Sequence, residues 1–525
     1  MLSEFIASAD PTLATLAGTS WFILVLVYIR YLASWKTPSR GLSPPPGPRP
    51  FPIIGNLLDW PKANQWATFR DLGIKYGDVL YLKLLNQDTV VLGSPKAITE
   101  FLNKKSANTS DRPSSAVSHL TGLDINFSGM PYGQQWRRHK RTFWQHFHPG
   151  ALPAYQQTQC HAAHRFLRRL LEKPSKLREH IRFAFTTAIV KVLFDIDVSD
   201  ENDEMMDIVE AALAWTGEVF TPGKYLVEVL PILKYVPPWI PGATLQRLSV
   251  YYRYTIARLK DVPYGRARGE GADCVVGKLI RKMISERDGS ATTEEENIIK
   301  NVAAVSLEGA LRLYHMFSTV QTVFVAMSRY PEVLKKAQAE LDAVLGPNRL
   351  PEFSDTSSLV YVNAVIKEAL RWQVVVPFSL PHMTTEDDVF RGYFIPAGTV
   401  IMPNVSACMH DPNIYEDPYE FRPERFIHNG RLDFSSAPDP ASFVFGFGRR
   451  ICPGRYFAEN GLFINVASVL HVFDITPPVD DQGNVIDIVP QVTDGLLCYP
   501  VDCRCTIQPR SAEARALVQA AQTVG

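Results

Sequence analysis

A net charge and a disulfide framework are both missing from this sequence. The 54 lysines and arginines balance the 54 aspartates and glutamates, so no electrostatic argument favours nucleic acid as a partner. The seven cysteines are scattered, which is too sparse for a disulfide scaffold and favours a reducing compartment. Internal repeats and low-complexity blocks are also missing. What remains is a chain of 525 residues, 46% of them hydrophobic, long enough for several average domains or one large enzyme domain.

A long apolar run near the N-terminus predicts a membrane anchor, with a cleaved or soluble helix as the alternative. Residues 12–29 come near the ~20 apolar residues that a spanning helix needs. A secretory signal would carry basic residues before the run, whereas Glu4 and Asp10 precede this one. Basic residues follow it instead: Arg30, Lys36 and Arg40. The positive-inside rule therefore makes residues 1–35 a single-pass anchor, with the N-terminus in the lumen and the remaining chain in the cytosol.

The rest of the chain predicts one mainly helical domain with a minor β component. A proline-rich segment within residues 36–50 forms a stiff, extended hinge between the anchor and the folded body. Strand-like pieces lie at three places: residues 76–93, 398–402 and 496–507. Helical patterns dominate after Trp136. We therefore predict a single domain over residues 51–510, followed by a C-terminal tail over residues 511–525.

Three helices are predicted in the second half of the chain. A capping box at Thr293–Glu296 opens a long helix that continues to about Arg329. Pro331 begins the next helix and Gly346 ends it. A stripe of apolar residues at helical spacing marks the third helix, over residues 359–372.

The stretch Phe445-Gly-Phe-Gly448-Arg-Arg450-Ile-Cys452-Pro-Gly454 carries the strongest functional signal. Cys452 precedes a helical pattern, so the positive end of a helix and nearby backbone N–H groups favour an ionised thiolate that ligates a metal. Gly448 and Gly454 let the backbone turn tightly and approach a large flat partner. Arg450 offers a forked cation that suits a carboxylate. These features fit a thiolate-ligated haem, against the alternative of a structural cysteine in a glycine-rich turn.

The same stretch matches the haem loop Phe-x-x-Gly-x-Arg-x-Cys-x-Gly, and so resembles the cytochrome P450 superfamily. Three further segments are similar to fungal microsomal members: Trp136–His148, Tyr330–Gly346 and Pro381–Gly392. The resemblance extends over nearly the whole chain and implies a cytochrome P450-like fold, mainly α with minor β. It also implies haem, iron protoporphyrin IX, with Cys452 as the axial thiolate and metal ligand. Phe445, Gly446 and Arg450 are then expected to bind the cofactor.

Glu368 and Arg371 lie at i, i+3 in a strongly apolar helix, which predicts a buried ion pair. Arg425, in Pro423-Glu-Arg-Phe426, supplies a second guanidinium. Both motifs resemble those of the family in type and order. The resemblance implies that Glu368, Arg371 and Arg425 lock the fold around the haem loop, in a structural and not a catalytic role.

The segment Trp136-Arg-Arg-His-Lys140 resembles the family motif Trp-x-x-x-Arg, whose Trp and Arg bind a haem propionate. Lys140 keeps the cation but loses the bidentate fork, and the adjacent Arg141 is an alternative partner. His382 resembles another propionate contact, with a purely structural histidine as the alternative. The basic helix is also expected to dock the reductase.

One departure from the family concerns the long helix above the haem. Counting back from Tyr330, the family's acid and threonine, which relay protons to bound oxygen, correspond to Tyr314 and His315. A positioned proton donor typically contributes ~10²–10⁴-fold in rate. Three interpretations stay open: a different relay through Tyr314, His315 or Glu308, chemistry that needs no relay, or a reading-frame fault within residues 311–317.

The resemblance implies a haem-thiolate monooxygenase in the endoplasmic reticulum membrane, with its catalytic domain in the cytosol. It is expected to take electrons from NADPH through cytochrome P450 reductase and to use O2 to oxidise a lipophilic small molecule. A terpenoid or polyketide of fungal secondary metabolism is the substrate that the resemblance suggests. The alternatives are a haem-thiolate enzyme with non-oxygenase chemistry, such as peroxide use, rearrangement or dehydration, and a catalytically dead haem-binding protein.

Overall fold

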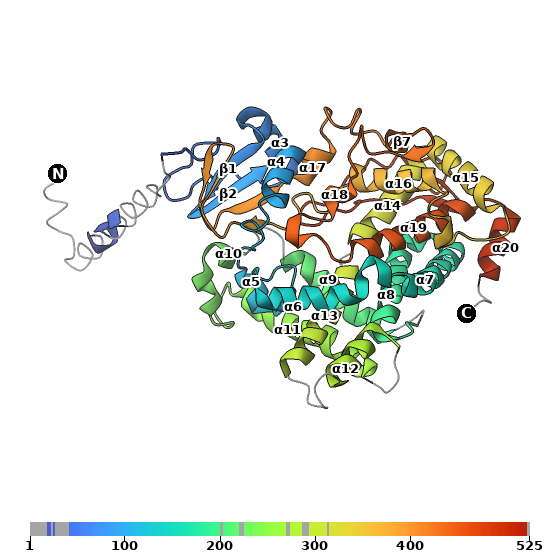
Figure 1. The fold of residues 1–525 in the computed structure, drawn as a ribbon, viewed down its shortest axis with the longest axis horizontal. Coiled ribbons are helices and arrows are strands. Elements are labelled where there is room, and N and C mark those ends of the chain that lie inside the picture. Colours follow the sequence, from blue (N-terminus) through green and yellow to red (C-terminus); the bar gives the residue numbers. More distant parts are fainter. Residues whose placement is uncertain are drawn as a thin grey trace.

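A sheet-containing end and a larger helical body make up the molecule, shown in Figure 1 as a computed structural model. The structure describes residues 18–22, 25–26, 41–199, 203–219, 225–268, 273–285, 293–311 and 314–521. Most of the predicted spanning helix over residues 12–29 lies outside these ranges and stays a prediction. Within the described ranges, no helix combines the length and the apolar character that crossing a bilayer requires.

The main sheet has four strands in the order β1-β2-β6-β3. They are β1 (Val79–Leu84), β2 (Gln87–Leu92), β3 (His382–Met383) and β6 (Val400–Pro403). β2 pairs antiparallel with β1 and parallel with β6, whose other side pairs antiparallel with β3. The strands expected within residues 76–93 and near residues 398–402 are therefore confirmed. His382 lies opposite Ile401 in the edge strand of this sheet.

Three two-stranded ladders complete the β component. They are β4 (Asp388–Phe390) with β5 (Tyr393–Ile395), β7 (Ile427–His428) with β8 (Arg431–Leu432), and β9 (Phe473–Thr476) with β10 (Thr506–Pro509). The strand expected over residues 496–507 is wrong over most of its length, because only its end belongs to β10. Instead, the N–H of Cys498 donates to the carbonyl of Val375 at 2.7 Å. Val492 and Pro500 pair only as an isolated bridge, so no ladder continues through this segment.

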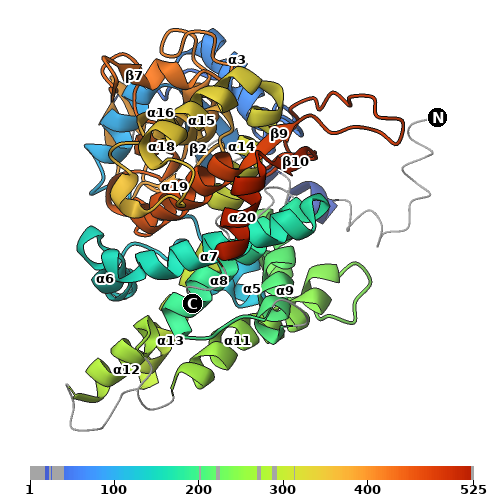
Figure 2. The ribbon, with the colours of Figure 1, turned by 90° about the vertical axis from the view of Figure 1, so that its right-hand side faces the viewer.

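Two groups of helices build the body, and Figures 1 and 2 both place one group below the other. The lower group contains α6 (Gln134–Phe147), α7 (Pro153–Glu172), α8 (Leu177–Phe194), α9 (Glu204–Val219), α11 (Thr244–Ala267), α12 (Val275–Ser285) and α13 (Thr293–Leu311). The upper group contains α14 (Tyr314–Arg329), α15 (Pro331–Leu345), α16 (Val360–Trp372) and α19 (Arg455–Val472). Further helices are α3 (Gln65–Tyr76), α4 (Pro95–Ile98), α5 (Ala116–Thr121), α10 (Leu226–Val229), α17 (Val405–Met409), α18 (Ala441–Val444) and α20 (Ala512–Ala520).

The predicted helices of the second half are present. The long helix expected from Thr293 to Arg329 corresponds to α13 and α14, with residues 312–313 outside the described chain. α15 ends before Gly346, which caps it with φ +66°. α16 matches the third predicted helix. α20 lies within the predicted tail and buries Val518.

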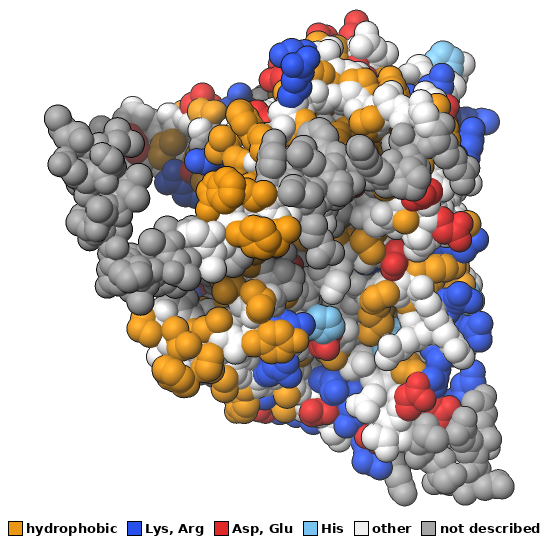
Figure 3. Space-filling view, turned by 90° about the vertical axis from the view of Figure 1, so that its left-hand side faces the viewer, with side chains coloured by type: hydrophobic (Ala, Val, Ile, Leu, Met, Phe, Trp, Pro, Cys, Tyr) orange, Lys and Arg blue, Asp and Glu red, His pale blue; other side chains and the backbone are white. Residues whose placement is uncertain are grey.

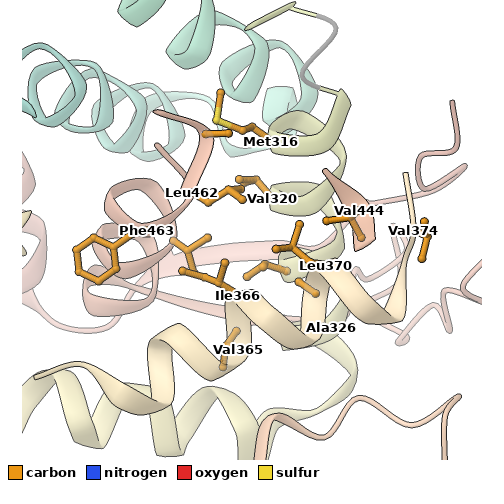
Figure 4. Packing of buried hydrophobic residues seen from close by; sticks show 14 of the residues in the cluster. Met316, Val320, Ala326, Val365, Ile366, Leu370, Val374, Val444, Leu462 and Phe463 are labelled. Atoms are coloured by element: carbon orange, nitrogen blue, oxygen red, sulfur yellow. The ribbon is translucent and has the colours of Figure 1, made fainter. Parts of the chain in front are cut away.

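The core of the upper group lies where α14, α16 and α19 meet. Figure 4 shows Val320 of α14, Ile366 and Leu370 of α16, and Leu462 of α19 packed around one another. All four side chains are buried. Burial of a side chain of this size stabilises the fold by about 1.5–3 kcal/mol, so this packing firmly fixes α19. The position of α19 in turn fixes the loop that precedes it, which contains Cys452.

Candidate active site

Cys452 lies in a tight loop between α18 and α19. Its backbone N–H donates to the carbonyl of Phe445 at 2.8 Å, which closes the loop. A short 3-10 turn, Gly448–Arg450, precedes Cys452, and Gly454 is the N-cap of α19. The thiol therefore lies at the N-terminal end of a long buried helix, where the sequence predicts it.

Gly448 is the point at which this loop contacts a helical turn from a distant part of the chain, Thr99–Asn103. Its φ is +54°, and a Cβ at this position would lie 2.5 Å from the carbonyl oxygen of Leu102. Its N–H donates to Oδ1 of Asn103 at 2.8 Å. Only glycine combines this backbone conformation with so close an approach.

Burial is the largest influence on the Cys452 thiol and raises its pKa above the ordinary value. The N–H of Gly454 and the charges of Lys140 and Arg455 act in the opposite direction. The predicted help from the helix start is therefore present, but it does not outweigh the cost of burial. A positive partner such as an iron ion is needed to keep this sulfur ionised.

A cavity lies beside Cys452, between the loop and α13. Its walls are largely apolar and come from distant parts of the sequence: Phe127, Val305, Val376, Leu380, Val444, Leu496 and Leu497. Gly309, Phe445 and Gly446 also line it. Ser379 lines the cavity with a φ of +53°, a strained conformation of the kind that gathers at ligand sites.

Three buried or half-buried cations line the same cavity: Arg112, Lys140 and Arg450. All three donate hydrogen bonds to backbone carbonyls. Arg112 donates to Ser128, Leu380 and Pro381, and Arg450 donates to Ser110, Phe127 and Met130. Lys140 donates to Arg449 and Ile451. In the described chain, no carboxylate forms an ion pair with them. Burial lowers the pKa of Arg112 to about 9, that of Arg450 to about 10 and that of Lys140 to about 8. The charge of Asp111 offsets part of this effect for Arg112 and Arg450, without a direct ion pair. Because burial still outweighs it, this rim suits a negatively charged ligand.

His382 adds a polar group near these cations. Its Nδ1–H donates to the carbonyl of Thr109 at 2.7 Å. Its Nε2 is buried and has no partner among the residues that the structure describes. Burial, followed by the charge of Arg112, holds the pKa of His382 well below its usual range. A carboxylate here would give Nε2 a partner and favour its protonation.

Trp136 connects these groups. The guanidinium of Arg450 lies 4.5 Å from the centre of the Trp136 ring, and Nζ of Lys140 lies 5.1 Å from it. The predicted pair Trp136 and Lys140 therefore meets Arg450 at the rim of the cavity. Arg141, the expected alternative to Lys140, is exposed.

The residues present fit a haem. Cys452 supplies a sulfur ligand, and the apolar walls suit a flat ring. Arg112, Lys140, Arg450 and the orphaned Nε2 of His382 suit its two carboxylates. Of the predicted cofactor residues, His382 does not line the cavity but lies within electrostatic reach of Arg112 and Arg450. The other six line it: Trp136, Lys140, Phe445, Gly446, Arg450 and Cys452.

Arg112 is a site residue that was not predicted from the sequence. Its partners Leu380 and Pro381 are 268 and 269 residues away. The only local signal is the following Pro113, which favours an extended backbone at Arg112 but indicates no ligand.

The predicted ion cluster is formed by Glu368, Arg371 and Arg425. Nε and Nη2 of Arg371 donate to the two carboxylate oxygens of Glu368, each at 2.8 Å. Nε of Arg425 donates to the same carboxylate at 3.2 Å. Burial is the largest influence on Arg425 and lowers its pKa. None of the three lines the cavity, so the geometry supports a structural role.

The distal candidates Tyr314 and His315 stay predictions, because their side chains lie outside the described part of the structure. Glu308, the alternative relay, is buried in α13. Its Oε2 accepts a hydrogen bond of 3.0 Å from Nδ2 of Asn126, a residue that lines the cavity.

This fold and this site define a haem-thiolate enzyme. Residues 45–498 match the family Cytochrome P450, and the chain belongs to that family. It is 37% identical to the cytochrome P450 monooxygenase COX2 of Coprinopsis cinerea, over 91% of this chain and 92% of that protein. It is 36% identical to the cytochrome P450 monooxygenase 208 of Postia placenta, over 96% of this chain and 97% of that protein.

A third relative is the cytochrome P450 monooxygenase ple1 of Rhodocybe pseudopiperita, 35% identical over 95% of each chain. The chain is accordingly a cytochrome P450 monooxygenase. Membership of the family means that it uses haem with thiolate ligation, a redox partner, O2 and a small-molecule substrate.

Proposed function

We propose that this monooxygenase oxidises a lipophilic small molecule, a terpenoid or polyketide of fungal secondary metabolism. The observation that carries the proposal is the apolar cavity between Cys452 and α13. Val305 and Gly309 form one wall, and Leu496 and Leu497 form part of another. Such walls exclude water and hold a hydrocarbon skeleton by dispersion and burial. The fungal relatives support a fungal-type enzyme but do not specify the substrate.

The roles of the chain's own residues follow from the geometry. Arg112, Lys140, Arg450 and His382 would hold the haem carboxylates, and Cys452 would hold the iron. When bound, the haem supplies oxygen activation, in which electron donation from the thiolate favours O–O cleavage. The apolar residues orient the substrate and keep water away from the reacting atoms.

The redox partner is proposed to be NADPH-cytochrome P450 reductase. Three exposed arginines lie on the loop that contains Cys452 and on α6, which contacts it: Arg449 of the loop, and Arg137 and Arg141 of α6. Nζ of Lys140 donates to the carbonyl of Arg449 at 2.6 Å and so joins α6 to the loop. A basic surface next to the thiolate suits an acidic electron donor, because opposite charges steer encounter and orientation.

The location is proposed to be the endoplasmic reticulum membrane, with residues 12–29 as the single span and the catalytic domain in the cytosol. Figure 3 shows hydrophobic side chains gathered on the face that is at the left in Figure 1. Large exposed hydrophobic residues follow α10: Leu230, Ile232, Tyr235 and Trp239. Trp239 is 80% exposed, which suits contact with a lipid surface. Deletion of residues 1–35 should release the protein from alkali-washed membranes with its haem spectrum intact. Full-length protein in the soluble fraction would overturn this location.

The function is tested by supplying candidate substrates to yeast cells that express the protein and by identifying the products. The full-length chain, co-expressed with a fungal reductase in yeast, is supplied with terpenoids and polyketides under labelled O2. The expected result is NADPH-dependent product that carries one labelled oxygen. Cys452→Ala should lose both the product and the red-shifted carbon monoxide band of thiolate-bound haem, whereas the control Cys160→Ala keeps both. Product formed without NADPH, or without labelled oxygen, would instead favour non-oxygenase chemistry.

A further inference from the structure

The turn over residues 126–130 connects the charged rim of the cavity to α13. Arg112 and Arg450 hold one side of it through backbone carbonyls. On the other side, Oε2 of Glu308 accepts the hydrogen bond from Nδ2 of Asn126. The turn is thus fixed from two directions before any substrate enters.

The carboxamide of Asn126 is oriented by two hydrogen bonds. Its Oδ1 accepts from the backbone N–H of Ser128 at 2.9 Å, which forms an Asx turn. Its Nδ2 uses one hydrogen on Glu308, and the described residues offer no acceptor for the second. Asn126 is 5% exposed and lines the cavity. A buried N–H without an acceptor is costly, so this group calls for a ligand oxygen.

Asn126 differs from the cations and the cysteine that line the cavity. Arg112, Lys140 and Arg450 are matched to the haem carboxylates, and Cys452 is matched to the iron. Asn126 is instead tied to α13, on which Val305 and Gly309 form the apolar wall. Val305, Glu308 and Gly309 share one side of the helix by their spacing, so Glu308 holds the amide beside the space left for substrate.

We propose that Asn126, positioned by Glu308, binds an oxygen atom of the substrate. The inference rests on the proposed function, because it requires a lipophilic molecule in this cavity. An N–H donor selects an acceptor, so the ligand is an apolar skeleton that carries a carbonyl or hydroxyl oxygen. The substrate then already carries this oxygen when it binds, either from the assembly of its skeleton or from an earlier hydration or oxidation. Asn126 acts on specificity, and Glu308 acts as its positioning residue.

The test uses holoprotein and pairs of compounds that differ by one oxygen: cedrol against cedrane, and flavanone against flavan. Binding is followed by the substrate-induced shift of the haem spectrum. We expect wild-type protein to bind the oxygenated member about three- to tenfold more tightly in at least one pair, the range of one net hydrogen bond. Asn126→Leu should remove this preference and keep the affinity for the member of each pair that lacks the added oxygen.

Glu308 provides a matched pair of variants. Glu308→Gln keeps an acceptor for Nδ2 and should retain most of the preference, whereas Glu308→Met removes the acceptor and should lose it. The carbon monoxide spectrum of each variant reports whether the haem site has formed. If Asn126→Leu yields no holoprotein, the Gln and Met variants of Glu308 decide the question.

The outcomes separate the two proposals. Equal affinity for both members of every pair in the wild type, or an unchanged preference in Glu308→Met, overturns the role of Asn126 and leaves the proposed function intact. Failure of every compound to bind overturns the proposal of a lipophilic substrate, and the role of Asn126 with it. A preference that is lost in Asn126→Leu and Glu308→Met but kept in Glu308→Gln supports substrate binding by Asn126.

Discussion

The guanidinium of Arg371 spans both carboxylate oxygens of Glu368, and both side chains are fully buried. The remaining donors of Arg371 reach the carbonyls of Met409, Pro418 and Glu420, at 2.8, 2.7 and 3.2 Å. The pair therefore holds α16 against a segment that lies 38 to 49 residues further along the chain. Because every donor is used, the charges can stay buried without a large net cost.

Removal of one member of this pair should prevent assembly of the holoprotein. Glu368→Ala leaves two buried guanidinium groups without their carboxylate, which costs roughly 3–5 kcal/mol. Haem content and thermal unfolding measure the effect. Glu179→Ala is a matched control, because Glu179 also pairs at i, i+3, with Lys176, but is 60% exposed. The control should change stability by less than about 0.5 kcal/mol. A folded Glu368→Ala holoenzyme with merely altered turnover would contradict the structural role.

Gly448→Ala should weaken the haem loop more than an alanine at another left-handed glycine. At Gly448 the new methyl would overlap the carbonyl of Leu102, in addition to the unfavourable φ. Gly483→Ala is the control, because Gly483 has φ +84° and nothing within 4 Å of an added Cβ. The control should cost about 1–2 kcal/mol, and Gly448→Ala more than that. Equal unfolding temperatures for the two variants would contradict the close approach.

The sequence predicts those parts of the site whose residues lie close together along the chain. The Cys452 loop is contiguous, so its motif places the ligand, the turn and the start of the helix together. Glu368 and Arg371 share one helical turn, and helical spacing is enough to pair them. Arg112 and the contact between Asn126 and Glu308 could not be predicted in this way. They depend on tertiary contacts between distant segments, 182 residues apart in the second case, and no local pattern marks either.

Lys140 predicts a pH dependence of haem uptake. Burial lowers the pKa of its ammonium to about 8 in the protein without haem, from an ordinary value of 10.5. The cation that suits a haem carboxylate is therefore present below about pH 8 and lost as the pH rises above it. Lys140→Arg keeps its charge throughout this range. In titrations of apoprotein with haemin from pH 6.5 to 9.5, the affinity of wild type relative to Lys140→Arg should fall as the pH rises through about 8. A constant ratio would mean that Lys140 does not contact the carboxylates. Both proteins share Cys452, and loss of the Lys140 charge, which acts on this thiol, should add to the fall in the ratio.

The last prediction concerns Tyr314 and His315, the residues that the sequence leads us to expect at the positions of the family's acid and threonine. A tyrosine is neutral near pH 7 and a weak acid, and a histidine is bulkier than a threonine and can itself ligate a metal. If these two residues occupy the relay positions, the protein should couple poorly, with NADPH oxidation that releases peroxide instead of product. Replacement of both residues, Tyr314→Asp with His315→Thr, should raise the ratio of product to NADPH consumed if the family's relay is what is missing. Genomic sequence over residues 305–320 separates a reading-frame fault from a genuine departure. Tight coupling in the unmodified protein, together with a loss of activity in the double variant, would show that this helix relays protons in its own way.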